Sequence, residues 1–419
     1  MAAIIEATNA YDRPVEEAPA EGPLSGLVVA DCSTVLAGPY CTMVLADLGA
    51  EVIKIEPLEG DSTRGWGPPW VEAAGDTPAR VAAYFLAVNR NKRSVRLDLR
   101  RAEGGDVLRR LLAKADVLVE NFRPGGFERL GFDDRALDRI NPRLVHLAIT
   151  GYGPDGPDAP RPGYDFVAQA VGGLMSITGF PDDEGGRPTK VGVAISDIVT
   201  GLFGAVSVLA ALRTGNAQRV DVSLLESTLA LLINQGQNAF ATGTPPVRRG
   251  NAHPNIVPYE TFETADAEIA VAAASERQWL RLCRVLGLES LAADPRFADN
   301  DARVRNREAL RRILAERFVT LPAAEWLARL ESAEVPSGRV NDVLTAVEQP
   351  QSRARQMDVA VEHPLLGRIR QLGMPYKLSA SPATIRSAPP LLGEHTDEVL
   401  AELGYDAASI TQLHAQGVV

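Results

Sequence analysis

A strand–helix–strand pattern near the start of the chain constrains the fold more than any other feature. Leu27–Ala30 is a short continuous apolar run, typical of a strand buried on both faces. Tyr40–Leu48 is predicted to be a helix that follows Pro39 and that Gly49 closes, and Glu51–Glu56 alternates as a second strand. Two strands joined by a helix over so short a stretch pair in parallel through a right-handed crossover. We therefore expect a parallel sheet covered by helices.

The alternation of strands and helices continues beyond this unit. Further strands are predicted at Ser94–Leu99, Asp116–Glu120 and Leu144–Ile149, and helices at Glu103–Lys114 and Glu128–Ile140. Regular alternation of this kind defines the α/β class and a doubly wound sheet. We predict a large Rossmann-like domain with a parallel sheet over residues 23–225.

The chain has 419 residues, which is too many for one ordinary hydrophobic core. Loop residues at Thr244–Gly250 mark a change of composition. We predict a linker over residues 226–250, a small α+β domain over 251–335, and a second linker with a return to the large domain over 336–419. Residues 1–22 are acidic and are expected to form a disordered lead.

Within the small domain, residues 257–274 alternate like a small sheet with a turn at Ala265–Asp266, and residues 276–331 hold three helical patterns. The chain is expected to end in a helix that has Thr396 as its N-cap.

The acidic composition excludes several classes of partner. The net charge of -11 and the pI of about 5.1 argue against nucleic acid and against a membrane surface. Three scattered cysteines do not form a disulfide framework, and five histidines show no metal-ligand spacing, so no metal site is expected. The first 22 residues lack the basic and apolar regions of a signal peptide, which indicates a cytoplasmic protein.

Two segments match patterns whose usual meaning does not fit here. Gly151–Gly156 matches GxGxxG, but Pro154 and Pro157 interrupt the helix that should follow, so a surface loop is favoured over a dinucleotide site. Val191–Leu212 is apolar enough to resemble a membrane span, but it contains Asp197 near its start and lacks flanking basic loops. A buried helix is therefore favoured.

Asp197 lies where a long helix rich in Ala, Val and Leu should begin; the helix should run to Arg213, with Gly215 near its C-cap. One interpretation of Asp197 is an N-cap. The other is a catalytic carboxylate, because helix N–H groups and the helix dipole stabilise a carboxylate and the oxyanion of a tetrahedral intermediate. A carboxylate held in an apolar pocket is a reasonable nucleophile toward a thioester.

Basic residues gather between Asn89 and Arg101. They form either a solvated edge or a docking surface for the phosphates of an anionic ligand. Asn121–Gly126 follows the end of a predicted strand, which is where α/β folds place ligands.

Together these segments resemble the class III CoA-transferases, the CaiB–BaiF type, from Leu24 onward. The matching pieces, in chain order, are 24–29 (LSGLVV), 36–40 (LAGPY), 48–56 (LGAEVIKIE), 91–94 (NKRS), 116–125 (DVLVENFRPG), 130–132 (LGF), 163–165 (GYD), 196–197 (SD) and 392–396 (LGEHT). Each piece is short, and their order and spacing carry the resemblance.

The resemblance implies an interlocked homodimer in which each chain has a large Rossmann-type domain and a small domain joined by two linkers. It implies that Asp197 is the nucleophile, which forms an aspartyl mixed anhydride and then an aspartyl-CoA thioester. Coenzyme A is then a substrate and carrier, no cofactor is permanently bound, and the partners are an acyl-CoA and a free carboxylic acid.

The resemblance also implies which residues bind CoA. The implied contacts are Val35, Leu36, Ala37, Leu97, Asp98, Leu99, Arg100, Asn121, Phe122 and Arg129, with Tyr164 and Asp165 beside the nucleophile. A loop over the intermediate maps near Gly250, Asn251 and His253, although this loop is glycine-poor here.

Departures from related enzymes bear on the substrate. Formyl-CoA transferases carry Gln where Leu36 stands and Arg where Pro57 stands, so a formyl–oxalate pair is disfavoured. Residues 253–262 (HPNIVPYETF) look closer to members that use succinyl-CoA and other dicarboxylic acids. Arg248 and Arg249 then either hold a distal carboxylate or are exposed to solvent.

Two other functions have to be weighed against CoA transfer. The 2-methylacyl-CoA racemases resemble this chain, but they pair the aspartate with a His where Tyr164 stands, and a Tyr with a pKa near 10 is a poor acid/base group. A non-catalytic CoA-binding subunit would have no need for Asp197. Acyl-CoA:carboxylate CoA transfer is therefore favoured.

Overall fold

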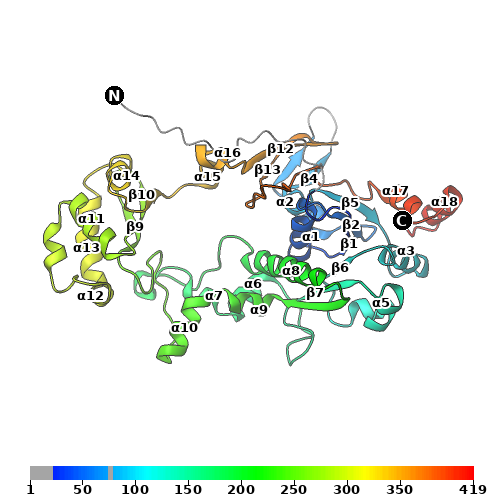
Figure 1. Cartoon of the computed structure of the whole chain (residues 1–419), viewed down its shortest axis with the longest axis horizontal. Coiled ribbons are helices and arrows are strands. Elements are labelled where there is room, and N and C mark those ends of the chain that lie inside the picture. Colours follow the sequence, from blue (N-terminus) through cyan, green and yellow to red (C-terminus); the bar gives the residue numbers. More distant parts are fainter. Residues whose placement is uncertain (1–21, 74–78) are drawn as a thin grey trace. The chain divides into compact units, whose positions relative to one another are not determined.

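The computed structural model describes residues 22–73 and 79–419 (Figure 1). The lead predicted for residues 1–22 lies, except for Gly22, outside the described residues. The chain divides into two compact units. The first consists of Met1–Gly172, Gly192–Ile233 and Pro350–Val419, and the second of Gly173–Val191 and Asn234–Gln349.

The unit boundaries differ from the predicted domain ranges at three places. The linker predicted over 226–250 is divided between the units after Ile233, and residues 336–349 belong to the second unit. Gly173–Val191 belongs to the second unit, although it lies inside the range predicted for the large domain, 23–225. The reason is packing: Gly179 and Phe180 lie against Gly250 rather than against the large sheet.

The first unit is built on a six-stranded parallel sheet. In spatial order the strands are β5 (Lys92–Arg96), β2 (Glu51–Glu56), β1 (Val28–Cys32), β6 (Val117–Glu120), β7 (Val145–Thr150) and β8 (Gln218–Ser223). Every neighbouring pair is parallel. The strand order reverses between β1 and β6, as in doubly wound sheets, where the crevice at the reversal binds ligands.

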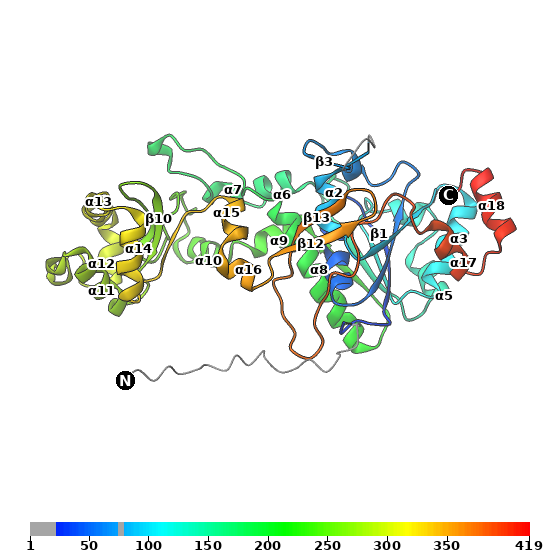
Figure 2. The ribbon, with the colours of Figure 1, turned by 90° about the horizontal axis from the view of Figure 1, so that it is seen from above.

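Alternate residues of the strands enter two separate cores. Ala30 and Leu118 face one cluster with α3 (Ala102–Leu112), α5 (Asp134–Ile140), α17 (Thr396–Glu402) and α18 (Ala407–Ala415). Val29 and Val117 face the other, with α1 (Ala37–Asp47) and α8 (Ile195–Thr214). Burial on both faces explains the continuous apolar runs of these strands. Figure 2 shows the C-terminal helices α17 and α18 beside α3.

Smaller elements complete the first unit. These are α2 (Ala83–Val88), α4 (Gly126–Arg129), α6 (Asp165–Val171), α9 (Leu224–Ala230), α16 (Pro350–Ala354), the pair β3 (Trp70–Glu72) and β4 (Arg80–Ala82), and the pair β12 (Asp358–His363) and β13 (Gly367–Leu372).

The second unit pairs a three-stranded antiparallel sheet with helices. Its strands are β9 (Tyr259–Glu263), β10 (Glu268–Ala272) and β11 (Ser337–Arg339), and its main helices are α11 (Glu276–Leu286), α12 (Asn300–Arg305), α13 (Arg307–Phe318) and α14 (Ala323–Ser332). Trp279, Phe318 and Trp326 fill its core. Four helices stand where three patterns were predicted, because a break at Asn306 separates α12 from α13.

Two predicted helices have different limits in the structure. The helix expected over 128–140 is split into α4 and α5, because Gly131 adopts a left-handed conformation (φ 90°) and Asp133 caps a new helix through the Ala136 N–H at 2.7 Å. The N-cap of α17 is His395 and not Thr396, as was predicted. The Thr396 hydroxyl instead accepts a hydrogen bond from the backbone N–H of Arg96 at 3.1 Å.

Among the described residues, α8 is the one helix long and apolar enough to cross a membrane by length and composition alone. This helix was predicted to be buried, but only 39% of its most apolar stretch is buried. One face lies along α1, where Gly201 approaches so closely that a Cβ there would stand 2.6 Å from the Ala37 carbonyl oxygen (Figure 1). The other face exposes Leu202, Phe203 and Val206.

Candidate active site

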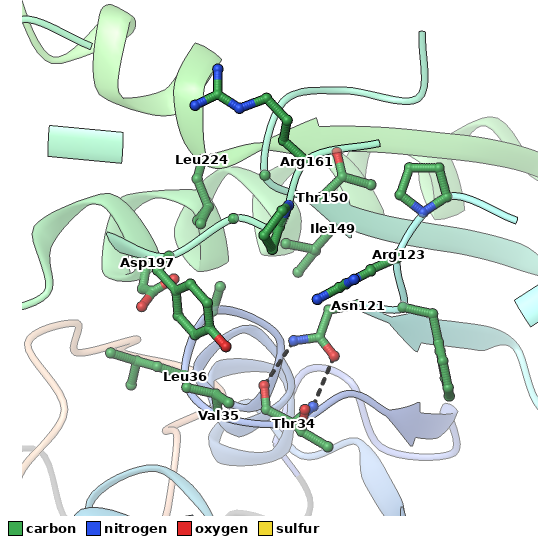
Figure 3. A pocket seen from close by; sticks show the side chains of 17 residues that line it. Thr34, Val35, Leu36, Asn121, Arg123, Ile149, Thr150, Arg161, Asp197 and Leu224 are labelled. Atoms are coloured by element: carbon green, nitrogen blue, oxygen red, sulfur yellow. Dashed lines mark hydrogen bonds between the residues drawn. The ribbon is translucent and has the colours of Figure 1, made fainter. Parts of the chain in front are cut away.

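A cavity of about 200 Å³ lies at the carboxyl ends of β1 and β6, where the strand order reverses (Figure 3). It is lined by Thr34, Val35, Leu36, Ala37, Asn121, Phe122, Arg123, Pro124, Ile149, Thr150, Gly151, Arg161, Pro162, Gly163, Tyr164, Asp197 and Leu224. All of these residues belong to the first unit. The cavity therefore occupies the position where doubly wound sheets bind ligands.

Asn121 joins the two loops that form this crevice. Its side-chain Nδ2 donates to the Thr34 carbonyl oxygen at 2.8 Å, and its Oδ1 accepts from the Thr34 N–H at 2.9 Å (Figure 3). Glu120, the last residue of β6, accepts a hydrogen bond from the Phe122 N–H at 2.6 Å. Asn121 and Phe122, which were predicted to bind CoA, thus lie in a loop that hydrogen bonds to Thr34 and to Glu120 hold in place.

Val35 has a strained backbone, with φ at 72°. A β-branched residue is an outlier in this region, and such strain costs on the order of 1–3 kcal/mol. Strain of this size persists only where the surrounding structure holds the residue in place.

Asp197 is the third residue of α8, whose N-cap is Ala194. The interpretation of Asp197 as the N-cap is therefore wrong. The cap is supplied from another helix, because Asp165 accepts a hydrogen bond from the Ser196 N–H at 2.8 Å. Among the described residues, none donates a hydrogen bond to the Asp197 carboxylate, which lines the cavity instead.

The surroundings of Asp197 weaken its acidity. Burial raises the pKa of Asp197, and the negative charge of Asp165 raises it further, to about 7. A carboxylate that has lost water without gaining hydrogen bonds is poorly stabilised as an anion. It is therefore a stronger nucleophile than a solvated carboxylate, and it exists in both protonation states near neutral pH.

Two cationic side chains line the same cavity. Arg161 forms an ion pair with Asp158 at 3.1 Å, and its guanidinium lies 4.9 Å from the centre of the Tyr152 ring. The Arg123 side chain has no hydrogen bond or ion pair to any residue in the described part of the chain. In a protein of net charge -11, a free arginine at this point favours an anionic ligand.

The glycine-rich loop expected at the surface contributes to the site. A Cβ on Gly151 would lie 2.5 Å from the Gly163 Cα, so both positions require glycine. The close approach brings Gly163 and Tyr164 to the cavity, with Asp165 beginning α6 directly after them. Gly151 is thus required by the close approach of the two loops.

The structure brings most predicted site residues of the first unit together. Val35, Leu36, Ala37, Asn121, Phe122, Tyr164 and Asp197 line the cavity, and Asp165 contacts the Asp197 helix. Leu97, Asp98, Leu99 and Arg100 do not line it, although they follow β5 at the same edge of the sheet; Asp98 is bonded to Arg100 at 2.8 Å. Arg129 lies on α4, beside Gly125.

The predicted loop residues Gly250, Asn251 and His253 belong to the second unit. Gly250, Asn251 and Arg249 line a cavity of about 280 Å³ within that unit, while His253 accepts a hydrogen bond from the Asn255 N–H at 3.1 Å. Arg248 also lines this cavity and forms an ion pair with the exposed Asp182.

Several cavity residues were missed by the sequence interpretation. They are Thr34, Arg123, Thr150 and Arg161. Tyr84 does not line the cavity, but its hydroxyl pKa is raised to about 12 by burial and by the charges of Asp197 and Asp165. Arg123 and Arg161 stand inside or next to quoted motifs, so they could have been found by proximity. Tyr84, in α2, carries no local signal. Among the described residues no group of three His, Cys, Asp or Glu side chains is arranged to hold a metal ion.

Comparison with known proteins shows which family the chain resembles. The model of CoA-transferase family III matches residues 24–396. A succinate–glutarate CoA-transferase of Agrobacterium fabrum is 42% identical over 91% of this chain and 96% of its own, and the human succinyl-CoA:glutarate CoA-transferase is 39% identical over 95% and 90%. The crystal structure of a CaiB/BaiF family protein from Brucella suis superposes with a TM-score of 0.80 at 43% identity, covering 91% of this chain and all of that one.

The chain therefore belongs to CoA-transferase family III, the CaiB/BaiF family. It is an enzyme of the CoA-transferase class, whose substrates are a CoA thioester and a carboxylic acid.

Proposed function

We propose that this enzyme transfers CoA between carboxylic acids through covalent intermediates on Asp197. The observation that carries the proposal is the state of this side chain: a largely buried carboxylate, without a hydrogen-bond donor among the described residues, in a cavity at the switch point of the sheet. A structural carboxylate at a helix start would accept backbone hydrogen bonds, and Asp165 performs that task here.

The chemistry has four steps that balance without an added cofactor. The Asp197 carboxylate attacks the thioester carbonyl of the donor, the C–S bond breaks, and a mixed anhydride forms as CoA thiolate leaves. The thiolate then attacks the Asp197 carbonyl carbon, which releases the donor acid and leaves an aspartyl-CoA thioester. The acceptor carboxylate attacks this thioester and releases thiolate again. Attack of the thiolate on the acceptor carbonyl yields the new acyl-CoA and regenerates Asp197.

The covalent role is tested by Asp197→Ala and Asp197→Asn. We expect both variants to lose CoA transfer while remaining folded, and mass spectrometry of wild-type enzyme incubated with acyl-CoA to find CoA on the peptide that contains Asp197. Hydroxylamine should cleave this adduct. The exposed N-cap Asp133→Asn is a matched control that should keep full activity. Full transfer by the Asp197→Ala variant would show that another group carries the acyl chain.

We propose a succinyl-CoA-like or other dicarboxylyl-CoA donor. Two observations support this choice: the relatives from Agrobacterium and human are succinate–glutarate and succinyl-CoA:glutarate CoA-transferases, and Leu36 lines the cavity where formyl-CoA transferases carry Gln. The test is incubation with succinyl-CoA and a panel of mono- and dicarboxylic acids, with mass-spectrometric detection of new thioesters. A preference for monocarboxylic acceptors would contradict the proposal.

A racemase would need a second acid/base group opposite Asp197. Tyr164 occupies the position where racemases carry His, and its side chain is 61% exposed. No histidine is among the residues that line the cavity. Exchange of the Cα hydrogen of a 2-methylacyl-CoA for deuterium in heavy water would favour the racemase instead.

We also propose that the chain forms a homodimer. The exposed face of α8 presents Leu202, Phe203 and Val206, with exposed fractions of 40%, 42% and 63%. Neighbouring large apolar side chains on one helix face are typical of an interface. Light scattering after size exclusion should give twice the chain mass of 44.9 kDa, and Val206→Glu should shift it toward the monomer.

A further inference from the structure

Two lysines in the segments that carry the family resemblance bond to backbone next to the Thr34–Ala37 wall of the cavity without lining the cavity themselves. Lys54 belongs to residues 48–56 and Lys92 to residues 91–94, and both side chains are fully buried. The proposed chemistry uses neither. A buried lysine is costly unless it is paired and hydrogen-bonded, so its contacts indicate what it stabilises.

Lys54 holds one side of the turn that follows β1. Its Nζ donates to the Ser33 carbonyl oxygen at 2.8 Å and forms an ion pair with Asp61 at 3.0 Å. Asp61 in turn accepts hydrogen bonds from the N–H of Val35, with N···O distances of 3.3 and 3.4 Å. The ion pair therefore connects the residue before Thr34 to the residue after it.

Asp61 is itself held in a fixed orientation. Its carboxylate accepts hydrogen bonds from the Thr63 N–H at 2.9 Å and from the Thr63 hydroxyl at 2.7 Å, and its own N–H donates to Glu56 at 2.9 Å. The side chains of Lys54 and Asp61 have no exposed surface. Because these hydrogen bonds fix the pair, it can hold the strained backbone of Val35 in place.

The second lysine fixes the flanks of the same turn. Lys92 pairs with Asp31 at 3.1 Å and donates to the Pro39 carbonyl oxygen at 2.8 Å. Asp31 also accepts hydrogen bonds from the Ser33 N–H and hydroxyl and from the Thr42 hydroxyl. Residues 31–39 are thus held by two buried lysines, and by Asn121, which lines the cavity.

We propose that Lys54 and Asp61 are a positioning pair that holds Val35 in its left-handed conformation, and thereby shapes the Thr34–Ala37 wall of the cavity for the CoA thioester. This inference rests on the proposed function, in that the cavity is taken as the acyl-CoA site. The pair acts through the backbone of the loop, and neither side chain lines the cavity.

The test combines removal of the pair with removal of the strain. In the neutral variant K54M/D61N both charges are lost together, so no unpaired buried charge remains. We expect the KM for succinyl-CoA to rise about tenfold, with a smaller change in kcat. Val35→Gly reaches a positive φ without steric cost. In the V35G background, K54M/D61N should therefore raise the KM for succinyl-CoA by only about threefold or less.

A control is the ion pair between the buried Arg303 and Glu276, at 2.6 Å in the second unit, whereas the Thr34–Ala37 loop belongs to the first unit. R303M/E276Q should lower Tm as K54M/D61N does, but leave the KM for succinyl-CoA unchanged, and V35G should not alter its effect. An equal rise of KM in both Val35 backgrounds, or no rise in the folded K54M/D61N protein, would overturn the positioning role.

Two measurements keep the inference separate from the proposed function. Calorimetric binding of CoA itself reports on the cavity wall even if no transfer occurs, and should follow the same pattern as KM. If K54M/D61N does not fold, the polar double variant K54Q/D61N, which also removes both charges together, takes its place in the same comparison with V35G. Failure of the Asp197 experiments with this pattern intact would contradict the covalent mechanism and leave the positioning role standing.

Discussion

Asp165 accepts a hydrogen bond from the backbone N–H of Ser196 at 2.8 Å, and so caps the helix that carries the neighbouring Asp197. Gln169 donates to the other carboxylate oxygen of Asp165 at 2.9 Å. One aspartate is thus stabilised as an anion by hydrogen bonds, while the other is left in the cavity without them. This division of roles between two adjacent carboxylates underlies the first two predictions.

The rate of transfer should rise with pH through about 7, because burial and Asp165 raise the pKa of Asp197 to about that value and only the ionised carboxylate attacks the thioester. Asp165→Asn keeps an oxygen for the Ser196 N–H but removes the charge, so the inflection should move to lower pH. The measurement is the pH profile of kcat/KM for both proteins. An unchanged inflection in Asp165→Asn would mean that the charge of Asp165 does not act on the nucleophile.

Asp197→Asn should stabilise the fold while abolishing transfer. The folded state favours the protonated carboxyl, so stability is fully present below the unfolded pKa near 3.8 and is lost as pH rises through about 7. At pH 8 the amide removes this cost, which is at most about 4 kcal/mol. Denaturant unfolding at pH 8 and pH 4 is the test, and the gain should appear at pH 8 and vanish at pH 4.

Arg123→Gln should weaken binding of the acyl-CoA. Its guanidinium lines the cavity with no partner among the described residues, so its charge is available to an anionic ligand. We expect KM to rise roughly tenfold, which corresponds to about 1.4 kcal/mol, and the salt dependence of KM to decrease. Arg143→Gln, an exposed arginine away from the cavity, serves as control. Equal effects of the two substitutions would show that Arg123 acts only through the net charge of the protein.

Gly151→Ala should lower both stability and activity, because its Cβ would stand 2.5 Å from the Gly163 Cα. The neighbouring atom belongs to the backbone, so it can move away only if the loop is displaced. The expected cost is about 1–3 kcal/mol. Gly65→Ala, whose Cβ would meet no atom within 4 Å, should have little effect. Thermal unfolding and transfer rates of the two variants decide this, and a Gly151→Ala protein as stable as wild type would show that the loop moves freely.

Local patterns identified the sheet where its strands are buried on both faces. The strands β1, β2, β6 and β7 were predicted within a few residues, β1 from its apolar run and β2 from its alternation. The edge strand β8 was missed, because its polar and half-exposed residues lack that signal. The break between α4 and α5 was missed as well, since it depends on the conformation of Gly131.

The order of the motifs predicted those parts of the candidate site that lie within single segments of the sequence. The loops at Thr34–Ala37 and Asn121–Phe122 and the nucleophile candidate Asp197 all line one cavity, as their positions after strands and at a helix start suggested. The implied contacts at Leu97–Arg100 do not line it, because β5 stands two strands away from β1.

By itself, then, the sequence determined most strands of the sheet and the family, and it indicated Asp197 as the candidate nucleophile, because these features reside in periodicity and in short motifs. Only the tertiary structure decided that Asp165 rather than Asp197 caps α8, and that Lys54 and Asp61 support the strained Val35. The physical reason is the same in both cases. Burial and long-range contacts set the charge state of a carboxylate and the conformation of a loop, and neither leaves a signal in the local sequence.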